Sequence, residues 1–290
     1  MSRLSDREQW ELVLPEMGYM ATLRNLRNFD KAGLKETHRK QVGIRLADPR
    51  EVENSRQLPF RFWAAYMNSS AYWQRYLGQA LDHSTRNVPV LPGRTLVLID
   101  TSGSMSVPMS TPRPRGNRTV RAMNAATGQT EDREPKVPQR VEAAALFGLA
   151  FALKNAGNVD VFGFADGQMA VTGLINSGKS LLEITSLFTA QVGRVGHGTQ
   201  IRRAVNDCYS GHDRIMLFSD CQAQDSYGAG GDVFSAVPQN RHCFAWNLAG
   251  YSKSAVIPGS TRHELGGLAD SSFQLILTLE RGSLEAWPWQ

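Results

Sequence analysis

Residues 94–105 read RTLVLIDTSGSM, and they are the strongest indicator of the fold of the residues that follow. Its apolar run, Leu96–Ile99, has the continuous hydrophobicity of a strand that is buried on both faces of a parallel sheet. The run leads directly to Asp100, and Ser102 and Ser104 follow. Because open parallel sheets bind ligands beyond the carboxyl ends of their strands, these three polar residues occupy the expected place of a binding site.

Short apolar runs alternate with helical patterns over residues 95–290. We expect further strands in VDVFGFA, DRIMLFSD and RHCFAWNL, and helices in RVEAAALFGLAFALKNAG, KSLLEITSLFTAQ and TQIRRAVNDCYS. The segment SSFQLILTLERGSLEAW combines β-prone residues with helical spacing, and a closing helix is favoured there. This alternation predicts an α/β domain with a doubly wound, mostly parallel, Rossmann-like sheet.

Residues 1–94 have helical periodicity instead. In GYMATLRNLRNF the side chains of Tyr19, Leu23 and Leu26 recur at helical spacing, and Asp48 before Pro49 is a typical helix start. Short helices with brief connections predict an α-helical repeat segment. Its many aromatic residues are suited to stack on bases, but their helical spacing favours packing.

The net charge of +5 is unevenly distributed. Residues 1–95 contain 15 Lys and Arg against 10 Asp and Glu, and residues 106–140 contain 7 against 3. A polyanion partner is one explanation of this excess, and a solvated basic face is the other. The insertion at residues 106–139 has several arginines and prolines and little apolar pattern, which is typical of a loop that is either functional or disordered.

Three cysteines without zinc-ligand spacing favour a reducing compartment over a disulfide scaffold. The N-terminal residues lack the apolar core of a signal peptide, and no apolar run approaches the roughly 20 residues of a membrane span. We therefore expect a cytoplasmic protein without a membrane partner.

Two further polar residues belong with the first three. Asp220 follows the apolar run RIMLFS, and Thr199 lies in the glycine-rich loop VGHGTQ, which opens a helix. Together Asp100, Ser102, Ser104, Thr199 and Asp220 offer only hard oxygen ligands, which suit Mg²⁺, with Mn²⁺ and Ca²⁺ as alternatives. The competing interpretation is that Asp100 and the serines only cap a turn.

Three segments, LVLIDTSGSM, GHGTQ and LFSDCQ, resemble the loops of a von Willebrand factor type A domain with a metal-ion-dependent adhesion site. This resemblance covers residues 95–290. The segment MGYMATLRNLRNFDKAGL, followed by LPFRFWAAY, resembles the end of the helical-repeat ring in the TROVE family, the Ro ribonucleoprotein proteins. Most upstream repeats of that ring are absent from this sequence, and the basic insertion also departs from the family pattern.

The family resemblance implies a component or scaffold that binds small noncoding RNA of the Y RNA type, with no DNA partner expected. It also implies that Ser102, Ser104 and Thr199 contact the ion directly, and that Asp100 and Asp220 act directly or through water. From the charge pattern, the candidate RNA-binding residues are Arg24, Arg27, Lys31, Lys35, Arg113, Arg115, Arg118 and Arg121.

The alternative function is a metal-dependent protein–protein interaction module without RNA binding, whose partner supplies an acidic ligand to the ion. Enzymatic activity is not expected. Neither Ser102 nor Ser104 lies in a G-x-S-x-G elbow, and the six histidines do not cluster in the sequence.

Overall fold

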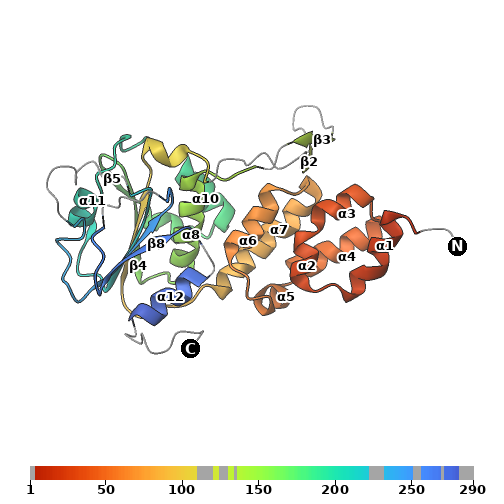
Figure 1. Cartoon of the computed structure of the whole chain (residues 1–290), viewed down its shortest axis with the longest axis horizontal. Coiled ribbons are helices and arrows are strands. Elements are labelled where there is room, and N and C mark those ends of the chain that lie inside the picture. The colour runs from red at the N-terminus through yellow and green to blue at the C-terminus, as the bar shows by residue number, and fades with distance from the viewer. Residues whose placement is uncertain are drawn as a thin grey trace. The chain divides into compact units, whose positions relative to one another are not determined.

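The computed structural model describes residues 4–109, 136–221, 232–250, 256–268 and 271–280, and the backbone of residues 120–123 and 130–133 (Figure 1). It divides into two compact units. Residues 1–87 and 112–136 form the helical unit, and residues 88–111 and 137–290 form the α/β unit. The division after residue 87 lies a few residues before the expected boundary at residue 94.

Short helices build the helical unit. They are α1 (Asp6–Val13), α2 (Tyr19–Arg24), α3 (Leu26–Ala32), α4 (Glu36–Ala47), α5 (Pro49–Asn54), α6 (Pro59–Met67) and α7 (Ala71–Ser84). Asp48 caps α5 by accepting hydrogen bonds from the backbone N–H groups of Arg50 and Glu51, with Pro49 at the first helical position. This is the helix start that the sequence predicted.

Several aromatic residues of the helical unit pack its core. Phe29, Phe62 and Trp73 are fully buried, and the Trp73 indole N–H donates to Asp30 at 2.8 Å. The Tyr19 hydroxyl donates to the Leu46 carbonyl at 2.8 Å, so its polar end is also satisfied. Packing therefore accounts for the buried aromatic residues of these helices.

A six-stranded sheet in the order β5-β4-β1-β6-β7-β8 forms the centre of the α/β unit. Its strands are β1 (Thr95–Asp100), β4 (Val159–Phe164), β5 (Gln168–Ala170), β6 (Arg214–Ser219), β7 (His242–Asn247) and β8 (Arg262–Gly266). All neighbours pair in parallel except β4 and β5. The doubly wound, mostly parallel sheet is confirmed.

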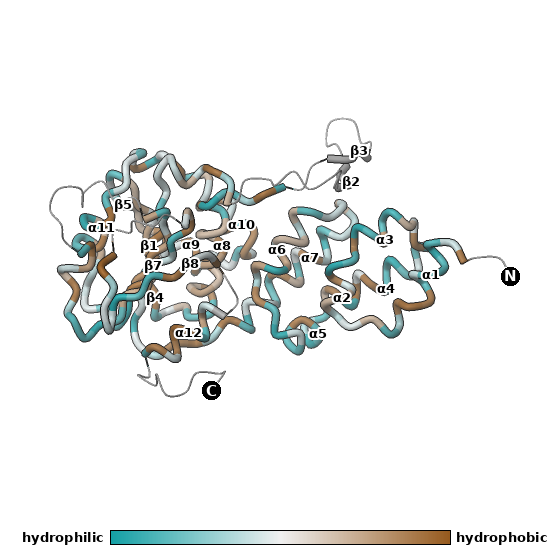
Figure 2. Tube along the Cα trace, viewed as in Figure 1, coloured by the Kyte–Doolittle hydropathy of each residue, from teal (hydrophilic) through white to brown (hydrophobic). Residues whose placement is uncertain are grey.

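Helices cover both faces of this sheet (Figure 1). They are α8 (Arg140–Lys154), α9 (Thr172–Ile175), α10 (Leu181–Thr189), α11 (Ile201–Cys208) and α12 (Ser271–Glu280). A 3₁₀ turn, Gly103–Ser106, follows β1. Helix α12 is the expected closing helix. Figure 2 shows hydrophobic residues concentrated in the central strands, as a sheet covered on both faces requires.

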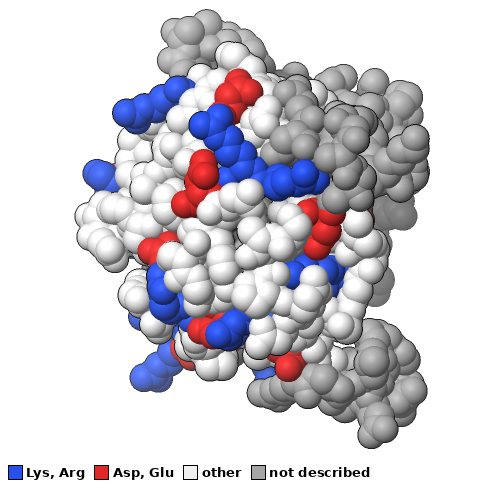
Figure 3. Space-filling view, turned by 90° about the vertical axis from the view of Figure 1, so that its left-hand side faces the viewer, with Lys and Arg blue, Asp and Glu red and all other residues white. Residues whose placement is uncertain are grey.

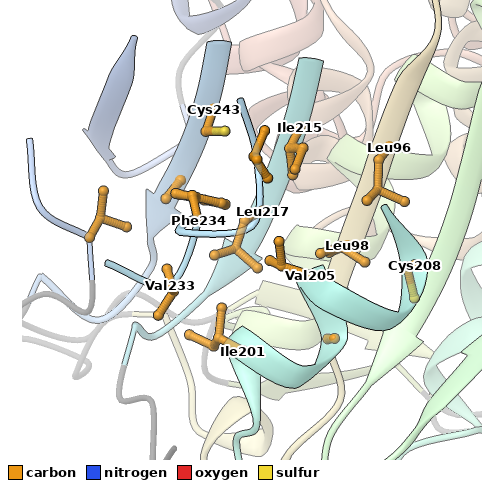
Figure 4. Packing of buried hydrophobic residues seen from close by; sticks show 14 of the residues in the cluster. Leu96, Leu98, Ile201, Val205, Cys208, Ile215, Leu217, Val233, Phe234 and Cys243 are labelled. Atoms are coloured by element: carbon orange, nitrogen blue, oxygen red, sulfur yellow. The ribbon is translucent and has the colours of Figure 1, made fainter. Parts of the chain in front are cut away.

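Strand β1 sends alternate side chains to the two layers. Leu96 and Leu98 belong to a buried cluster with Ile201 of α11 (Figure 4). On the other face α8 approaches closely, since a Cβ atom at Gly148 would lie 3.0 Å from Ile99 and 3.3 Å from Val97. Burial on both sides is the physical reason for the uninterrupted apolar run.

Two features differ from the sequence-based expectation. Strand β8 was not expected, because its sequence RHELG is short and polar, as an edge strand can be. Within the insertion, β2 (Val120–Met123) and β3 (Thr130–Arg133) pair antiparallel, although the sequence there has little apolar pattern.

Candidate metal centre and candidate nucleic-acid interface

The two candidate aspartates lie at the ends of neighbouring parallel strands. Asp100 ends β1, and Asp220 directly follows β6, which pairs with β1. Both carboxylates are fully buried. Parallel pairing therefore brings together two residues that are far apart in sequence.

Hydrogen bonds fix the Asp100 carboxylate. Its Oδ1 accepts from the backbone N–H of Ser102 at 2.8 Å, and its Oδ2 accepts from the Ser219 hydroxyl at 2.6 Å. Burial raises the pKa of Asp100 to about 6. The Ser102 and Ser219 hydrogen bonds oppose this shift, and the negative charge of Asp220 adds to it.

The two serines converge at the start of the turn after β1. The hydroxyl oxygens of Ser102 and Ser104 lie 3.2 Å apart, and Ser102 is fully buried. Two hydroxyl groups and two buried carboxylates thus gather at one edge of the sheet.

The Thr199 loop is joined to this turn through its backbone. The Gly103 N–H donates to the His197 carbonyl at 3.2 Å, and Thr199, two residues further on, is buried. The Asp166 Oδ2 accepts from the backbone N–H groups of His197 and Gly198 at 3.0 and 3.1 Å. These backbone hydrogen bonds lower the pKa of Asp166 and so favour the ionised carboxylate. The same hydrogen bonds tie the Thr199 loop to Asp166.

Arg140 supplies a positive charge to the same group. It is the first residue of α8, and its Nη1 lies 3.5 Å from the Asp220 Oδ2 and 3.5 Å from the Ser104 carbonyl oxygen. Its side chain is only 12% exposed. The buried cluster therefore holds two carboxylates and one guanidinium.

The donor set fits a hard divalent cation. Two buried carboxylates close to one guanidinium leave an excess negative charge, and the remaining donors are hydroxyl oxygens, which suit Mg²⁺, Mn²⁺ or Ca²⁺. Within the described residues, no group of three His, Cys, Asp or Glu side chains is placed to hold a metal ion, so a cation here would depend on hydroxyl oxygens beside the two carboxylates. The structure thus brings Asp100, Ser102, Ser104 and Asp220 together, with the Thr199 loop beside them.

Sequence reasoning missed three residues of this cluster. Asp166 and Ser219 lie at or just beyond the ends of β4 and β6, so the strand-end position that identified Asp100 also marked them. Arg140 carried no comparable signal, because it follows a long insertion and reaches Asp220 only through the fold.

Three arginines gather around one cavity in the helical unit. The cavity has a volume of about 390 Å³, and Arg24, Arg27 and Arg61 line it, from α2, α3 and α6. The other lining residues are apolar or neutral: Met20, Leu23, Leu26, Ala64, Ala65, Asn68 and Ser69. Two of the candidate RNA-binding residues thus line one cavity, and Arg61, which the sequence did not single out, lines it as well.

The remaining predicted RNA-binding residues lie elsewhere. Lys31 lines a different cavity, beside Trp10 and Asp6, and Lys35 forms a 3.3 Å ion pair with Glu11. The side chains of four others fall outside the described residues: Arg113, Arg115, Arg118 and Arg121.

On the face of the α/β unit drawn in Figure 3, the described Lys and Arg side chains are interspersed with Asp and Glu. Across the part of the chain that the structure describes, no helix combines the length and the apolar character needed to cross a membrane.

Residues 1–124 match the family model of the TROVE domain. The chain is similar in fold to the crystal structure of the Ro (RSR) protein of Deinococcus radiodurans, with a TM-score of 0.69 and 18% sequence identity. The similarity covers 96% of this chain and 56% of that one, so the chain spans little more than half the length of its structural relative. No curated protein matches the sequence.

Proposed function

We propose that the chain, whose residues 1–124 match the family model of the TROVE domain, is an RNA-binding component of a ribonucleoprotein. The ligand is a small noncoding RNA, held through its phosphates by the helical unit. The role is binding and scaffolding, without a catalytic step.

The arginine cavity is the observation that supports this proposal. Guanidinium groups bind phosphate oxygens in a bidentate manner, and three of them surround a cavity of about 390 Å³, large enough for a nucleotide-sized group. Among the described residues that line it, none is acidic. Arg24 and Arg27 form no ion pair with an acidic residue of the described part, so their charge is available to a polyanion.

Fluorescence anisotropy with a labelled small structured RNA tests the proposal at several salt concentrations. The test variant carries Arg24→Gln, Arg27→Gln and Arg61→Gln. The matched control removes three exposed arginines of the same unit outside the cavity, through Arg7→Gln, Arg50→Gln and Arg56→Gln.

We expect the cavity variant to bind RNA at least roughly tenfold more weakly than the wild type. The slope of log affinity against log salt concentration should be smaller in magnitude by about 2–3, because each phosphate contact that is lost removes about one released counterion. The control variant should change affinity much less. Equal losses in both variants, or wild-type affinity that does not depend on salt, would contradict the proposal. DNA of the same sequence should bind less tightly than RNA.

A second function is favoured by the strand-end cluster of the α/β unit. We propose that Asp100, Ser102, Ser104, Thr199 and Asp220 hold a divalent cation, with Mg²⁺ as the expected ion. When bound, the ion supplies a positive charge that attracts an acidic side chain of a protein partner. The buried carboxylates and the 3.2 Å separation of the Ser102 and Ser104 hydroxyls support this site.

Mn²⁺ binding, followed by electron paramagnetic resonance of the free ion, tests the metal site. The double variant Ser102→Ala/Ser104→Ala should lose at least roughly tenfold in affinity, because it removes two hard oxygen ligands. Ser106→Ala, an exposed serine of the same turn, should bind as the wild type does. Undiminished binding by the double variant would exclude these hydroxyls as ligands.

A further inference from the structure

Arg140 is held beside the metal loop by the backbone on both sides of the insertion. Its N–H donates to the Val107 carbonyl at 3.0 Å, and the Met109 N–H donates to the Pro138 carbonyl at 2.9 Å. Gln139 forms an isolated antiparallel bridge with Pro108. The position of the Arg140 backbone is therefore set by the fold and not by its side-chain contacts.

The Arg140 guanidinium reaches into the proposed ligand set. Its Nη1 lies 3.5 Å from the Asp220 Oδ2 and 3.5 Å from the Ser104 carbonyl oxygen. Asp220 is fully buried and the Arg140 side chain is 12% exposed, so water screens the interaction weakly. One carboxylate thus serves both an arginine and the proposed ion.

We propose that Arg140 is an internal cation that competes with the divalent ion for Asp220 and thereby sets the metal affinity of the site. This inference rests on the proposed metal-binding function. An entering ion must either share Asp220 with the guanidinium or displace it, and two positive charges at such short range repel each other. The Arg140 guanidinium therefore lowers the affinity of the site for a divalent ion.

Arg140 should also affect how strongly the metal-loaded site attracts an acidic ligand. Among the described residues, Asp100, Asp220 and Arg140 together carry a formal charge of −1 when both carboxylates are ionised, so these three groups and a bound divalent ion have a net charge of +1. An acidic ligand from a partner neutralises that charge. Wild-type protein should therefore bind metal and an acidic ligand cooperatively, and a variant without Arg140 should show weaker cooperativity.

Mn²⁺ titration of the whole chain, monitored by electron paramagnetic resonance, tests the inference with two neutral variants, Arg140→Met and Arg140→Gln. Arg140→Lys keeps the charge but loses the planar guanidinium. Lys179→Met is the matched control, because it removes one exposed positive charge of the same unit away from the cluster. Titrations with and without acetate, as a carboxylate probe, measure cooperativity.

We expect each neutral variant to bind Mn²⁺ roughly tenfold more tightly than the wild type or better, with Arg140→Lys in between and Lys179→Met within about twofold of the wild type. Detectable binding only in the neutral variants would support the inference most strongly. Equal or weaker binding by both neutral variants, with wild-type binding intact, would overturn it and leave the metal site standing. Absence of binding in the wild type and in both neutral variants would overturn the metal site as well.

Discussion

Replacement of Asp100 by Asn should stabilise the metal-free protein while abolishing its metal affinity. Burial raises the pKa of Asp100 from its ordinary value of 3.8 to about 6. The folded chain therefore retains a proton that the unfolded chain releases as the pH rises above 4. The stability that this proton contributes is fully present below pH 3.8 and is lost as the pH rises through about 6.

The size of the effect follows from the shift of about two pKa units. At about 1.4 kcal/mol per unit, ionised Asp100 costs roughly 3 kcal/mol at pH 7 in the absence of metal. Asn removes the charge and preserves the shape. Its carbonyl oxygen can accept from the Ser102 N–H and its amide can donate to the Ser219 hydroxyl, at the positions of the present 2.8 and 2.6 Å hydrogen bonds.

Thermal unfolding monitored by circular dichroism between pH 4 and pH 7.5, in excess EDTA, checks this prediction. Asp100→Asn should melt about 6–12 °C above the wild type at pH 7, and the difference should vanish near pH 4. Asp207→Asn, an exposed aspartate of the same unit whose ion pair with Arg203 is solvated, should change stability by less than about 1 kcal/mol.

Added Mg²⁺ should reverse the order of stability at pH 7. It should raise the melting temperature of the wild type by binding the folded state, and leave Asp100→Asn unchanged. Identical pH profiles for the wild type and Asp100→Asn in EDTA would contradict this prediction, because they would mean that Asp100 carries no buried charge.

Two further variants test the Thr199 loop beside the proposed metal site and the ion pair between Arg214 and Glu280. Gly196→Ala should weaken Mn²⁺ binding, because Gly196 has a φ of +99° and a Cβ there would collide with the Asp166 carboxylate. The control is Gly178→Ala, at a φ of +71° with open space around it. It should lower the free energy of unfolding by only about 1 kcal/mol and leave Mn²⁺ binding intact. Arg214→Met should lower the free energy of unfolding by about 3–5 kcal/mol in denaturant titration, because it leaves Glu280, now 2.8 Å from the guanidinium, without its partner. Wild-type Mn²⁺ affinity in the first variant, or wild-type stability in the last, would contradict these expectations.

The sheet was predictable because its signal is local. Each buried parallel strand must be apolar along its whole length, so Leu96–Ile99 and RIMLFS could be recognised without knowing their partners. Strand β8 was not, because an edge strand with one polar side has no such requirement. Likewise the helical period predicted the buried Tyr19, Leu23 and Leu26, but not the break between α2 and α3 at Asn25.

The candidate sites were predictable only in part. Strand ends identified the two carboxylates, and the same rule would have identified Asp166 and Ser219 if applied to every strand. Lys31 and Lys35 were grouped with Arg24 and Arg27 because they are close in sequence. In the structure neither lysine lines the arginine cavity: Lys31 lines another cavity, and Lys35 pairs with Glu11. Proximity along a chain of short helices is a poor guide to a shared surface, because each helix turns its residues through a full circle.

The α/β class, the helical segment and the strand ends that carry Asp100 and Asp220 could all be predicted from the amino-acid sequence, because hydrophobic periodicity reports burial residue by residue. The folded structure was needed to show that Ser219 holds the Asp100 carboxylate, that Arg140 lies against Asp220, and that Arg61 joins Arg24 and Arg27 around one cavity. Such pairings join residues tens to more than a hundred positions apart. Polar contacts of this kind depend on distance and burial in the folded chain, which no local pattern encodes.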